Sequence, residues 1–245
     1  MVTLLLIVSA FLAGILNAVA GGGSFLTFPA LVMAGVPPVE ANATSTVAVF
    51  PGALASFVGY RSQIRDVGEL SVKLVVVVSL IGGAAGAVLL LKTPENVFEA
   101  IAPWLLLAAT LLFAFGRQAS AWLRARVRIG PVTVLLSQFA IAVYGGYFGG
   151  GMGIMMLAVY SLYGLTNLHA MNGMKALSAG LLNAVAVVAF VAAHAVHWHE
   201  ALIMAASALA GGYTGAHVAQ RIDQRILRAV VIATGVAMTI WFFTK

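Results

Sequence analysis

The sequence has no cysteine and very little charge. Because none of its 245 residues is a cysteine, disulfide bonds and cysteine-ligated metals are excluded. Asp, Glu, Lys and Arg together make up 8% of the chain, whereas a soluble globular domain has roughly 25%. So few charges cannot cover a surface that faces water, and a soluble globular protein is therefore excluded.

Long apolar runs are present instead. Hydrophobic residues make up 62% of the chain, in runs such as 4–20 and 74–91. A run of about 20 apolar residues crosses the core of a bilayer. The runs show no alternation of period two, so helices rather than β-strands are expected to cross. We predict an all-α, polytopic transmembrane helical bundle, that is, a multi-pass protein of the lipid bilayer.

The small amount of charge is mostly positive. The net charge of +6 is typical of a membrane protein with basic cytoplasmic loops, and it does not indicate nucleic-acid binding. A cleaved signal peptide needs a basic start, which Met1-Val2-Thr3 lacks. We therefore expect residues 1–20 to be retained as the first helix.

The chain contains the same glycine pattern twice, at an offset of 129 positions. The glycine pairs in this single register are Gly21/Gly150, Gly22/Gly151, Gly35/Gly164, Gly82/Gly211, Gly83/Gly212 and Gly86/Gly215. Glycine in a membrane helix marks a close approach of two backbones or a break, so matched glycines predict matched packing. We predict two pseudo-symmetric repeats, 1–116 and 131–245, joined by a basic cytoplasmic linker at 117–130.

Ten helical segments are predicted. They are 4–20, 24–35, 41–60, 71–92, 97–115, 132–148, 152–163, 168–193, 200–220 and 226–243. The second segment of each half is too short to cross alone at about 1.5 Å per residue, which leaves eight full spans by hydropathy. If these Gly-broken segments cross, the repeats are inverted. If they are re-entrant, the repeats are parallel.

The basic loops favour inverted repeats. Only in that arrangement do the loops that contain Arg61, Arg124 and Arg221 all face the cytoplasm, as the positive-inside rule requires. Short, Gly-interrupted segments at corresponding positions are also a sequence indication of a transporter's binding site.

The first candidate binding elements are the two glycine-rich breaks. They comprise Asn17, Gly21, Gly22, Gly23 and Ser24 in the first half, and Gly149, Gly150 and Gly151 in the second. A helix that restarts after such a break presents free backbone N–H groups and its positive dipole end, which together bind anions. The alternative is a tight helix crossing that binds no ligand.

The second candidate binding elements are the polar residues of the helices that follow. Thr44, Ser45 and Thr46 lie in the first half, and Asn172 and Lys175 in the second. A lysine inside a membrane helix costs at least about 2.5–3.5 kcal/mol on insertion scales, and no carboxylate lies within helical reach of Lys175. Such a cation is expected to bind an anion or exchange a proton. The alternatives are hydroxyls bonded to their own helix and a lysine that snorkels to the interface.

No catalytic, cofactor or metal site is predicted. The sequence has no Walker-type phosphate loop and no nucleophile with an accompanying acid and base, so we expect no enzyme activity. His194, His197 and His199 beside Glu200 resemble a metal cluster, but an interfacial belt next to Trp198 is the preferred interpretation. All seven acidic residues fall near predicted helix ends. Because a cation pathway needs buried carboxylates, an anion is the expected cargo.

Four motifs together resemble one family. They are A-G-G-G-S-F-L-T-F-P at 20–29, G-V-P-P-x-x-A-N-A-T-S-T at 35–46, G-G-Y-F-G-G-G-M-G at 145–153 and H-A-M-N-G-M-K-A at 169–176. With the paired glycines, they make nearly the whole chain similar to the TauE/SafE sulfite exporter (TSUP) family. The resemblance implies a secondary transporter in the bacterial inner membrane. Its cargo would be a sulfur-containing anion: sulfite, thiosulfate, sulfoacetate or another organosulfonate.

We therefore expect an alternating-access carrier, with the two breaks, Thr44–Thr46, Asn172 and Lys175 forming an anion site between the halves. Coupling to protons, the direction of transport and the oligomeric state are left open. One alternative is a passive anion channel. A second is a non-transport membrane subunit with a metal site in the histidine cluster, and a third is a chaperone or assembly factor without cargo.

Overall fold

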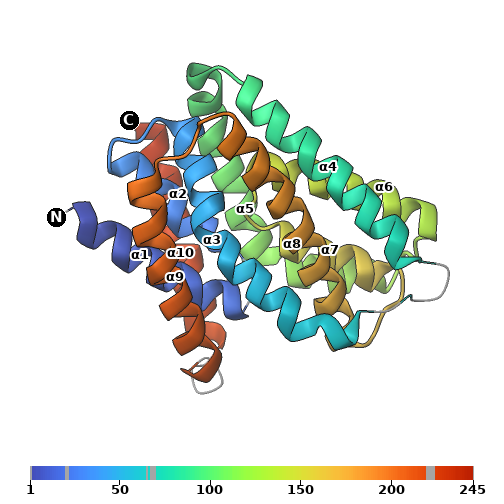
Figure 1. Cartoon of the computed structure of the whole chain (residues 1–245). Helices are drawn as coiled ribbons and strands as arrows, with labels where there is room; N and C mark the ends of the chain where they lie inside the picture. The colour runs from blue at the N-terminus through green and yellow to red at the C-terminus, as the bar shows by residue number, and fades with distance from the viewer. Residues whose placement is uncertain (1, 20–21, 65, 67–69, 219–223, 245) are drawn as a thin grey trace.

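The computed structural model describes residues 2–19, 22–64, 66, 70–218 and 224–244. The helices in these ranges are α1 (Val2–Val19), α2 (Ser24–Met33), α3 (Pro38–Tyr60), α4 (Val72–Lys92), α5 (Glu95–Arg124), α6 (Pro131–Tyr147), α7 (Met152–Leu162), α8 (Leu168–Ala192), α9 (Trp198–Val218) and α10 (Gln224–Thr244), with a 3-10 turn η1 at Arg61–Gln63 (Figure 1). The all-helical prediction is confirmed for the described residues.

Each predicted helical segment coincides with one of these helices, and the main difference is at the end of α5. The predicted helix ended at residue 115, whereas α5 continues through Gly116 to Arg124. Residues 117–124 contain neither glycine nor proline, and Ala, Leu, Gln and Arg are good helix formers. The first part of the predicted linker is therefore helical.

Glycine and proline set most of the other boundaries. Proline occupies the first position of α3 and of α6, where its missing N–H costs nothing. Gly35 and Gly164, with φ of +90° and +101°, terminate the short helices α2 and α7 at corresponding positions. The side chain of Asn167 caps α8 by accepting hydrogen bonds from the backbone N–H groups of His169 and Ala170.

Within the described residues, four helices are long and apolar enough to span a membrane by length and composition. They are Pro38–Tyr60, Val72–Lys92, Glu95–Gly116 and His169–Ala192. Shorter apolar helices include α2, α6 and α7. The chain is thus a polytopic helical protein, while the count of eight full spans stays a prediction.

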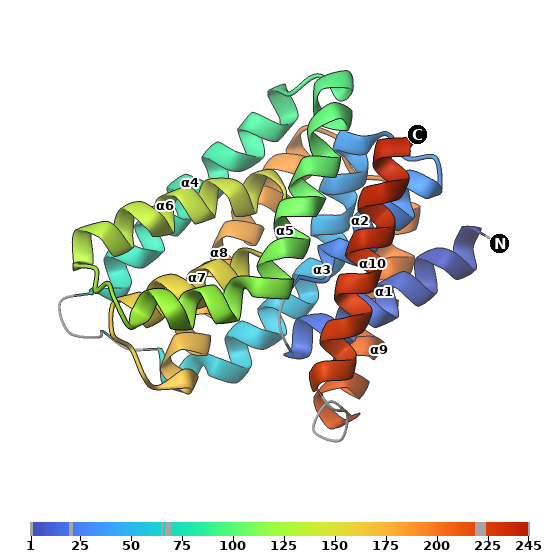
Figure 2. The ribbon, with the colours of Figure 1, turned by 180° about the vertical axis from the view of Figure 1, so that it is seen from behind.

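The helices of the two sequence halves are interleaved (Figures 1 and 2). Helix α1 packs along α9, and α4 packs along α6. Small residues permit both close crossings. A Cβ atom on Gly211 would overlap the carbonyl oxygen of Phe11, and one on Gly86 would overlap that of Val143.

Helices α3 and α8 pack together and run in opposite directions. Glu40, in the first turn of α3, contacts His197, which lies just beyond the end of α8. At the other end, Tyr60 and Asn172 line one cavity, although Tyr60 ends α3 and Asn172 lies near the start of α8. Helices α5 and α10 are also antiparallel neighbours, with the rings of Trp104 and Phe243 5.1 Å apart.

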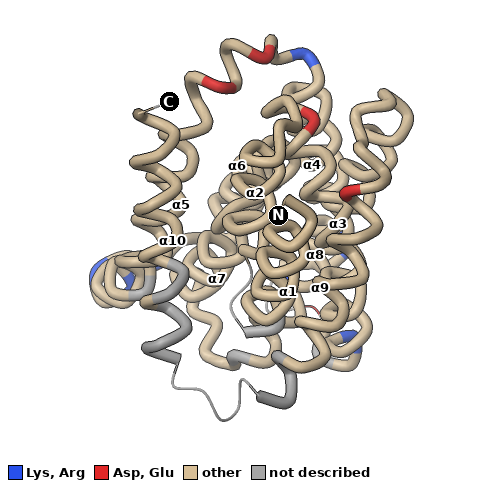
Figure 3. The backbone as a smooth tube through the Cα atoms, turned by 90° about the vertical axis from the view of Figure 1, so that its left-hand side faces the viewer, with Lys and Arg blue, Asp and Glu red and all other residues tan. Residues whose placement is uncertain are grey.

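The described glutamates and the arginines lie at opposite ends of the bundle. The described glutamates lie in or directly after the first turns of α3, α5 and α9: Glu40, Glu95, Glu99 and Glu200. These turns meet, because the N–H of Val39 donates to Oε2 of Glu95 and Glu40 contacts His197. The opposite end holds Arg61, Arg124, Arg126 and Arg128, at or just beyond the C-terminal ends of α3 and α5. Figure 3 shows most of the acidic residues at its upper end.

Candidate functional site

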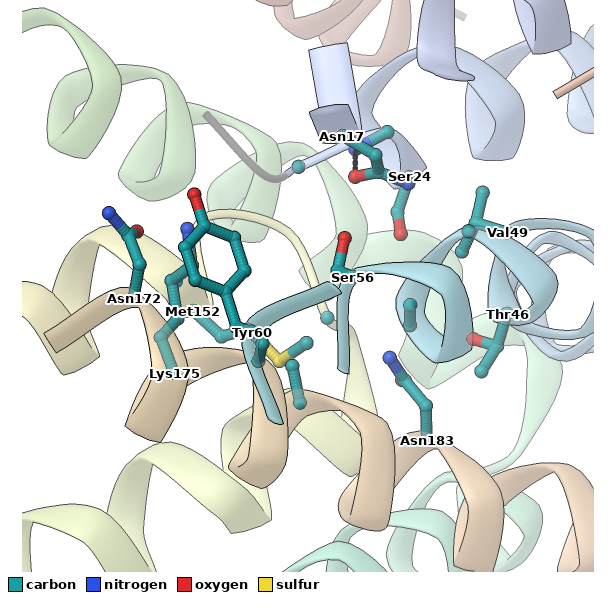
Figure 4. Close-up of a pocket in the computed structure, with 18 residues that line it drawn as sticks. Asn17, Ser24, Thr46, Val49, Ser56, Tyr60, Met152, Asn172, Lys175 and Asn183 are labelled. Atoms are coloured by element: carbon teal, nitrogen blue, oxygen red, sulfur yellow. Dashed lines mark hydrogen bonds between the residues drawn. The ribbon is translucent and has the colours of Figure 1, made fainter. Parts of the chain in front are cut away.

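A cavity lies between α3, α8 and the two glycine-rich breaks (Figure 4). Its volume is about 120 Å³, and since one water molecule needs about 10–15 Å³ of such space, a small oxyanion fits. The polar residues that line it are Asn17, Ser24, Thr46, Ser56, Tyr60, Asn172, Lys175 and Asn183. No carboxylate is among its described lining residues.

The first break is held in shape by Asn17. Its Oδ1 atom accepts a hydrogen bond of 2.8 Å from the backbone N–H of Gly23, across the turn from α1 to α2. Gly22 has a φ of +103°, which glycine adopts without strain. A Cβ atom on Gly23 would lie 2.7 Å from Nδ2 of Asn17. The close turn therefore requires both glycines.

The second break is held by Tyr144. Its hydroxyl donates to the carbonyl of Gly150 at 2.6 Å, while Gly149 and Gly151 have φ of +84° and +78°. The two breaks are adjacent, because a Cβ atom on Gly149 would lie 3.6 Å from Oγ of Ser24. The glycine-rich segments predicted from the sequence thus meet at one side of the cavity.

Lys175 supplies the only side-chain cation among the described lining residues. It lies on the face of α8 that also carries Asn172 and Asn183. Its ammonium group has no hydrogen-bonding or ionic partner in the described ranges. In Figure 4, Asn172, Lys175 and Tyr60 lie at one side of the cavity, and Thr46 and Asn183 at the other. A half-buried cation without a counter-ion favours the binding of an anion beside it.

Ser56 and Tyr60 are lining residues that the sequence analysis missed. They belong to a stripe on α3 that comprises Thr46, Val49, Ala53, Ser56 and Tyr60. Steps of three or four residues place all five on one helical face. The same periodicity, extended beyond Thr46, is the sequence signal that would have found them.

Eight of the thirteen predicted site residues line the cavity: Asn17, Gly22, Gly23, Ser24, Thr46, Gly149, Asn172 and Lys175. Gly21 lies outside the described residues. Four others are described but are not part of the lining: Thr44, Ser45, Gly150 and Gly151. Thr44 accepts a hydrogen bond from the N–H of His197 at 3.0 Å, and Ser45 contacts Thr27.

The histidine cluster forms contacts at the glutamate-rich end. Nε2 of His197 is 2.5 Å from Oε2 of Glu40, and its Nδ1 is 3.9 Å from Oε2 of Glu200. Within the described chain, no three His, Asp or Glu residues come together in a metal-binding arrangement. His197 instead connects the start of α3 to the turn between α8 and α9.

Comparison with known proteins identifies relatives over nearly the whole chain. The profile of the family described as "Sulfite exporter TauE/SafE" matches residues 6–242. A probable membrane transporter protein of Sinorhizobium sp. is 29% identical over 96% of this chain and 90% of its own length. A probable membrane transporter protein of Haemophilus influenzae is 28% identical over 94% of this chain and 89% of its own length. A probable membrane transporter protein of Escherichia coli is 30% identical over 59% of this chain and 53% of its own length. No solved structure matches.

Proposed function

Since this chain belongs to the sulfite exporter TauE/SafE family, whose relatives are membrane transporters rather than enzymes, we propose that it is a secondary transporter of a small sulfur-containing anion. The cargo class is sulfite, thiosulfate, sulfoacetate or another organosulfonate. The carrier works by alternating access in the bacterial inner membrane.

The observation that carries this proposal is Lys175 in a cavity without a described carboxylate. Its ammonium group offers three donors and a full positive charge. Asn172 and Asn183 add amide donors, and Ser24, Ser56 and Tyr60 add hydroxyls. An oxyanion with several acceptor oxygens matches this set of donors, whereas a cation would meet repulsion.

The start of α2 adds a second attraction for an anion. Helix α2 begins at Ser24, directly beside the cavity. The positive dipole end of a helix favours negative charge by about 0.3–1 kcal/mol at exposed sites. The N–H groups of Phe25, Leu26 and Thr27 already donate to the carbonyls of Gly22 and Gly23, and that of Gly23 donates to Asn17. The break therefore adds the positive dipole end of α2 to the cavity, rather than a set of free backbone donors.

Inverted repeats would supply the mechanism. In the 129-residue register, α3 corresponds to α8 and α5 to α10, and both pairs are antiparallel neighbours. Corresponding helices run in opposite directions when the pseudo-two-fold axis lies in the membrane plane. Each half contributes one helix to each of the two closely packed pairs, α1 with α9 and α4 with α6. Movement of these two pairs relative to each other would then expose the site to alternate sides.

The cavity extends to Tyr60, near the arginine-rich end. Tyr60 ends α3, and Arg61 follows it directly. Because basic residues mark cytoplasmic loops, this end faces the cytoplasm in our proposal. Towards the glutamate-rich end, the ring of Phe28 packs against those of Phe98, Phe148 and Phe242 and closes the bundle. We therefore propose that this conformation is inward-facing.

The test is sulfite transport by Lys175 variants in proteoliposomes. Lys175→Ala is expected to abolish saturable uptake of radiolabelled sulfite. Lys175→Arg should retain part of it, because arginine keeps the positive charge but has a different shape. Lys92→Ala, at the exposed C-terminal end of α4, is the matched control and should transport normally. Full activity of both Lys175 variants would remove this residue from the site.

Counter-flow separates a carrier from a channel. Liposomes preloaded with unlabelled sulfite should take up labelled sulfite faster than empty ones, because a carrier returns loaded more readily than unloaded. Flux that is insensitive to preloading would identify a passive channel instead.

A further inference from the structure

Asn42 carries a buried oxygen atom without a donor. Its side chain is 1% exposed, and its Nδ2 atom donates a 2.7 Å hydrogen bond to the carbonyl of Tyr147, the last residue of α6. This bond fixes the orientation of the amide. Its Oδ1 atom then has no hydrogen-bond partner among the described residues. A buried acceptor without a partner is rare in proteins and calls for an explanation.

The hydroxyls that share the face of Asn42 on α3 have no hydrogen left to give. Thr46 donates to the backbone carbonyl of Asn42 at 3.0 Å. Thr27 donates to the carbonyl of Gly23 at 3.2 Å, so in the 2.6 Å contact between Thr27 and Ser45 the donor is Ser45. Ser45 and Thr46 follow Asn42 by three and four residues, so both lie beside it on the helix surface. The result is a buried cluster of oxygen acceptors whose donors are already used.

The fold does not need polar residues at these positions. In the 129-residue register, Thr27, Asn42 and Ser45 correspond to three methionines: Met156, Met171 and Met174. All three are buried, at 0%, 5% and 1% exposure. The corresponding helices of the second half thus pack with apolar side chains where the first half buries one amide and two hydroxyls. Packing alone does not explain the polar set.

We propose that Asn42, Ser45, Thr46 and Thr27, with the carbonyl of Tyr147, form a site for a dehydrated Na⁺ ion. Na⁺ is a hard cation and takes oxygen ligands, among them carbonyls at the C-terminal ends of broken helices. The site has no carboxylate, which disfavours Ca²⁺ and Mg²⁺. The methionines at the corresponding positions are soft ligands, so the second half has no equivalent site.

The site adjoins the anion cavity. Thr46 belongs to both, and Gly23, which accepts the hydrogen bond of Thr27, also lines the cavity. This step rests on the proposed function: a cation held by neutral oxygens and an anion held beside it attract each other, so each raises the other's affinity by the same factor. Na⁺ would then be the coupling ion, and its gradient would drive the anion.

The first experiment measures ion binding without transport. The melting temperature of the full chain in detergent is compared in NaCl, KCl and choline chloride at equal ionic strength. A bound ion stabilises the fold in a saturable way, so NaCl should raise the melting temperature and the other two salts should not. Equal melting temperatures in the three salts, or an equal rise in KCl, would overturn the proposal.

Two serines provide a matched pair of variants. Ser45 and Ser79 are both 0% exposed, and each hydroxyl has one side-chain partner. Ser45→Ala should abolish the Na⁺-dependent rise or shift it to at least about tenfold higher Na⁺, because one ligand is lost, whereas Ser79→Ala should keep it. The double variant Thr27→Met, Ser45→Met introduces the methionines found at the corresponding positions of the second half. It should also lose the Na⁺-dependent rise in melting temperature. A Na⁺ effect that survives in both Ser45 variants places the ion elsewhere and refutes the site.

A second readout separates this site from the anion site. Sulfite is added as its choline salt, with and without NaCl, and its affinity is read from the melting temperature. Na⁺ should strengthen sulfite binding by about 5-fold or more, and Lys175→Ala should lose the sulfite effect but keep that of Na⁺. If Na⁺ stabilises the protein and sulfite does not, the proposed cargo fails while the cation site stands. If sulfite binds equally with and without Na⁺, the coupling fails.

Discussion

The Oδ1 atom of Asn17 accepts the backbone N–H of Gly23 at 2.8 Å, so one side chain at the end of α1 fixes the turn into α2. The same side chain also lines the cavity. Two replacements separate these two roles. Asn17→Leu removes the hydrogen-bond acceptor, whereas Asn17→Asp retains an acceptor and adds a negative charge.

We predict that Asn17→Leu destabilises the protein, because the buried N–H of Gly23 loses its acceptor at a cost of about 1–3 kcal/mol. The melting temperature in detergent should fall by several degrees. Asn17→Asp keeps an acceptor and should melt close to the wild type, yet bind sulfite about tenfold or more weakly, because like charges repel within a low-dielectric cavity. Unchanged sulfite binding by the Asp variant would place the anion away from this break.

Close contact between α4 and α6 gives a second prediction. Gly86→Ala would place a Cβ atom onto the backbone of Val143 and Tyr147, and relief requires the helices to separate. We expect a loss of about 1–3 kcal/mol, as for other overpacked sites, and a clearly lower melting temperature. Gly59, in α3, has no atom within 4 Å of the Cβ position. Gly59→Ala is the control and should be neutral or stabilising, by up to about 1 kcal/mol. Equal melting temperatures of the two variants would contradict the packing.

The absence of cysteine from the whole chain allows a labelling experiment without background. Ser56→Cys lies in the cavity wall, which opens toward the arginine-rich end in our proposal. A membrane-impermeant thiol reagent should label it in inside-out vesicles, and sulfite should slow the reaction by occupying the cavity.

Two other positions provide a positive and a negative control for the labelling of Ser56→Cys. Ala119→Cys, on the exposed part of α5, should react with or without sulfite, and Ser79→Cys, which is buried, should not react. Labelling of Ser56→Cys only from the outer side of intact cells would show that the cavity faces the other way.

The contact between Glu40 and His197 gives a fourth prediction. Both side chains are more than one-third exposed, so solvent screening limits their interaction to about 0.2–1 kcal/mol. Glu40→Gln and His197→Leu should each lower the melting temperature slightly. The double variant should be no less stable than the worse single one, because both remove the same contact. Additive losses would indicate that the two residues act independently.

The sequence predicted the helices well, because glycine and proline act locally. Gly35 and Gly164 require positive φ, so they end α2 and α7 wherever the rest of the chain lies. Lys175 and the glycine-rich breaks could also be identified from the sequence, since each is unusual within an apolar run. The stripe from Thr46 to Tyr60 was missed because the helix face toward the cavity depends on which partner α3 packs against.

The partners of each helix could not be read from the sequence. Nothing in the order of the segments shows that α1 packs on α9, or that Asn42 of α3 reaches Tyr147 at the end of α6. Thr44 and Ser45 follow Asn42 closely in the chain, yet they face His197 and Thr27. Such contacts depend on tertiary packing, and a hydroxyl in an apolar helix gives no local sign of its direction.

The pairing of α1 with α9 and of α4 with α6 also determines how the protein is made. During synthesis, α1 and α4 enter the membrane before α6 and α9 have been translated. The helix surfaces at Gly14 and Gly86 are therefore first in contact with lipid or with an insertase. We therefore expect that neither half folds stably alone. Two separately translated halves should restore the carrier only when both are synthesised in the same cell, and a half expressed by itself should be degraded.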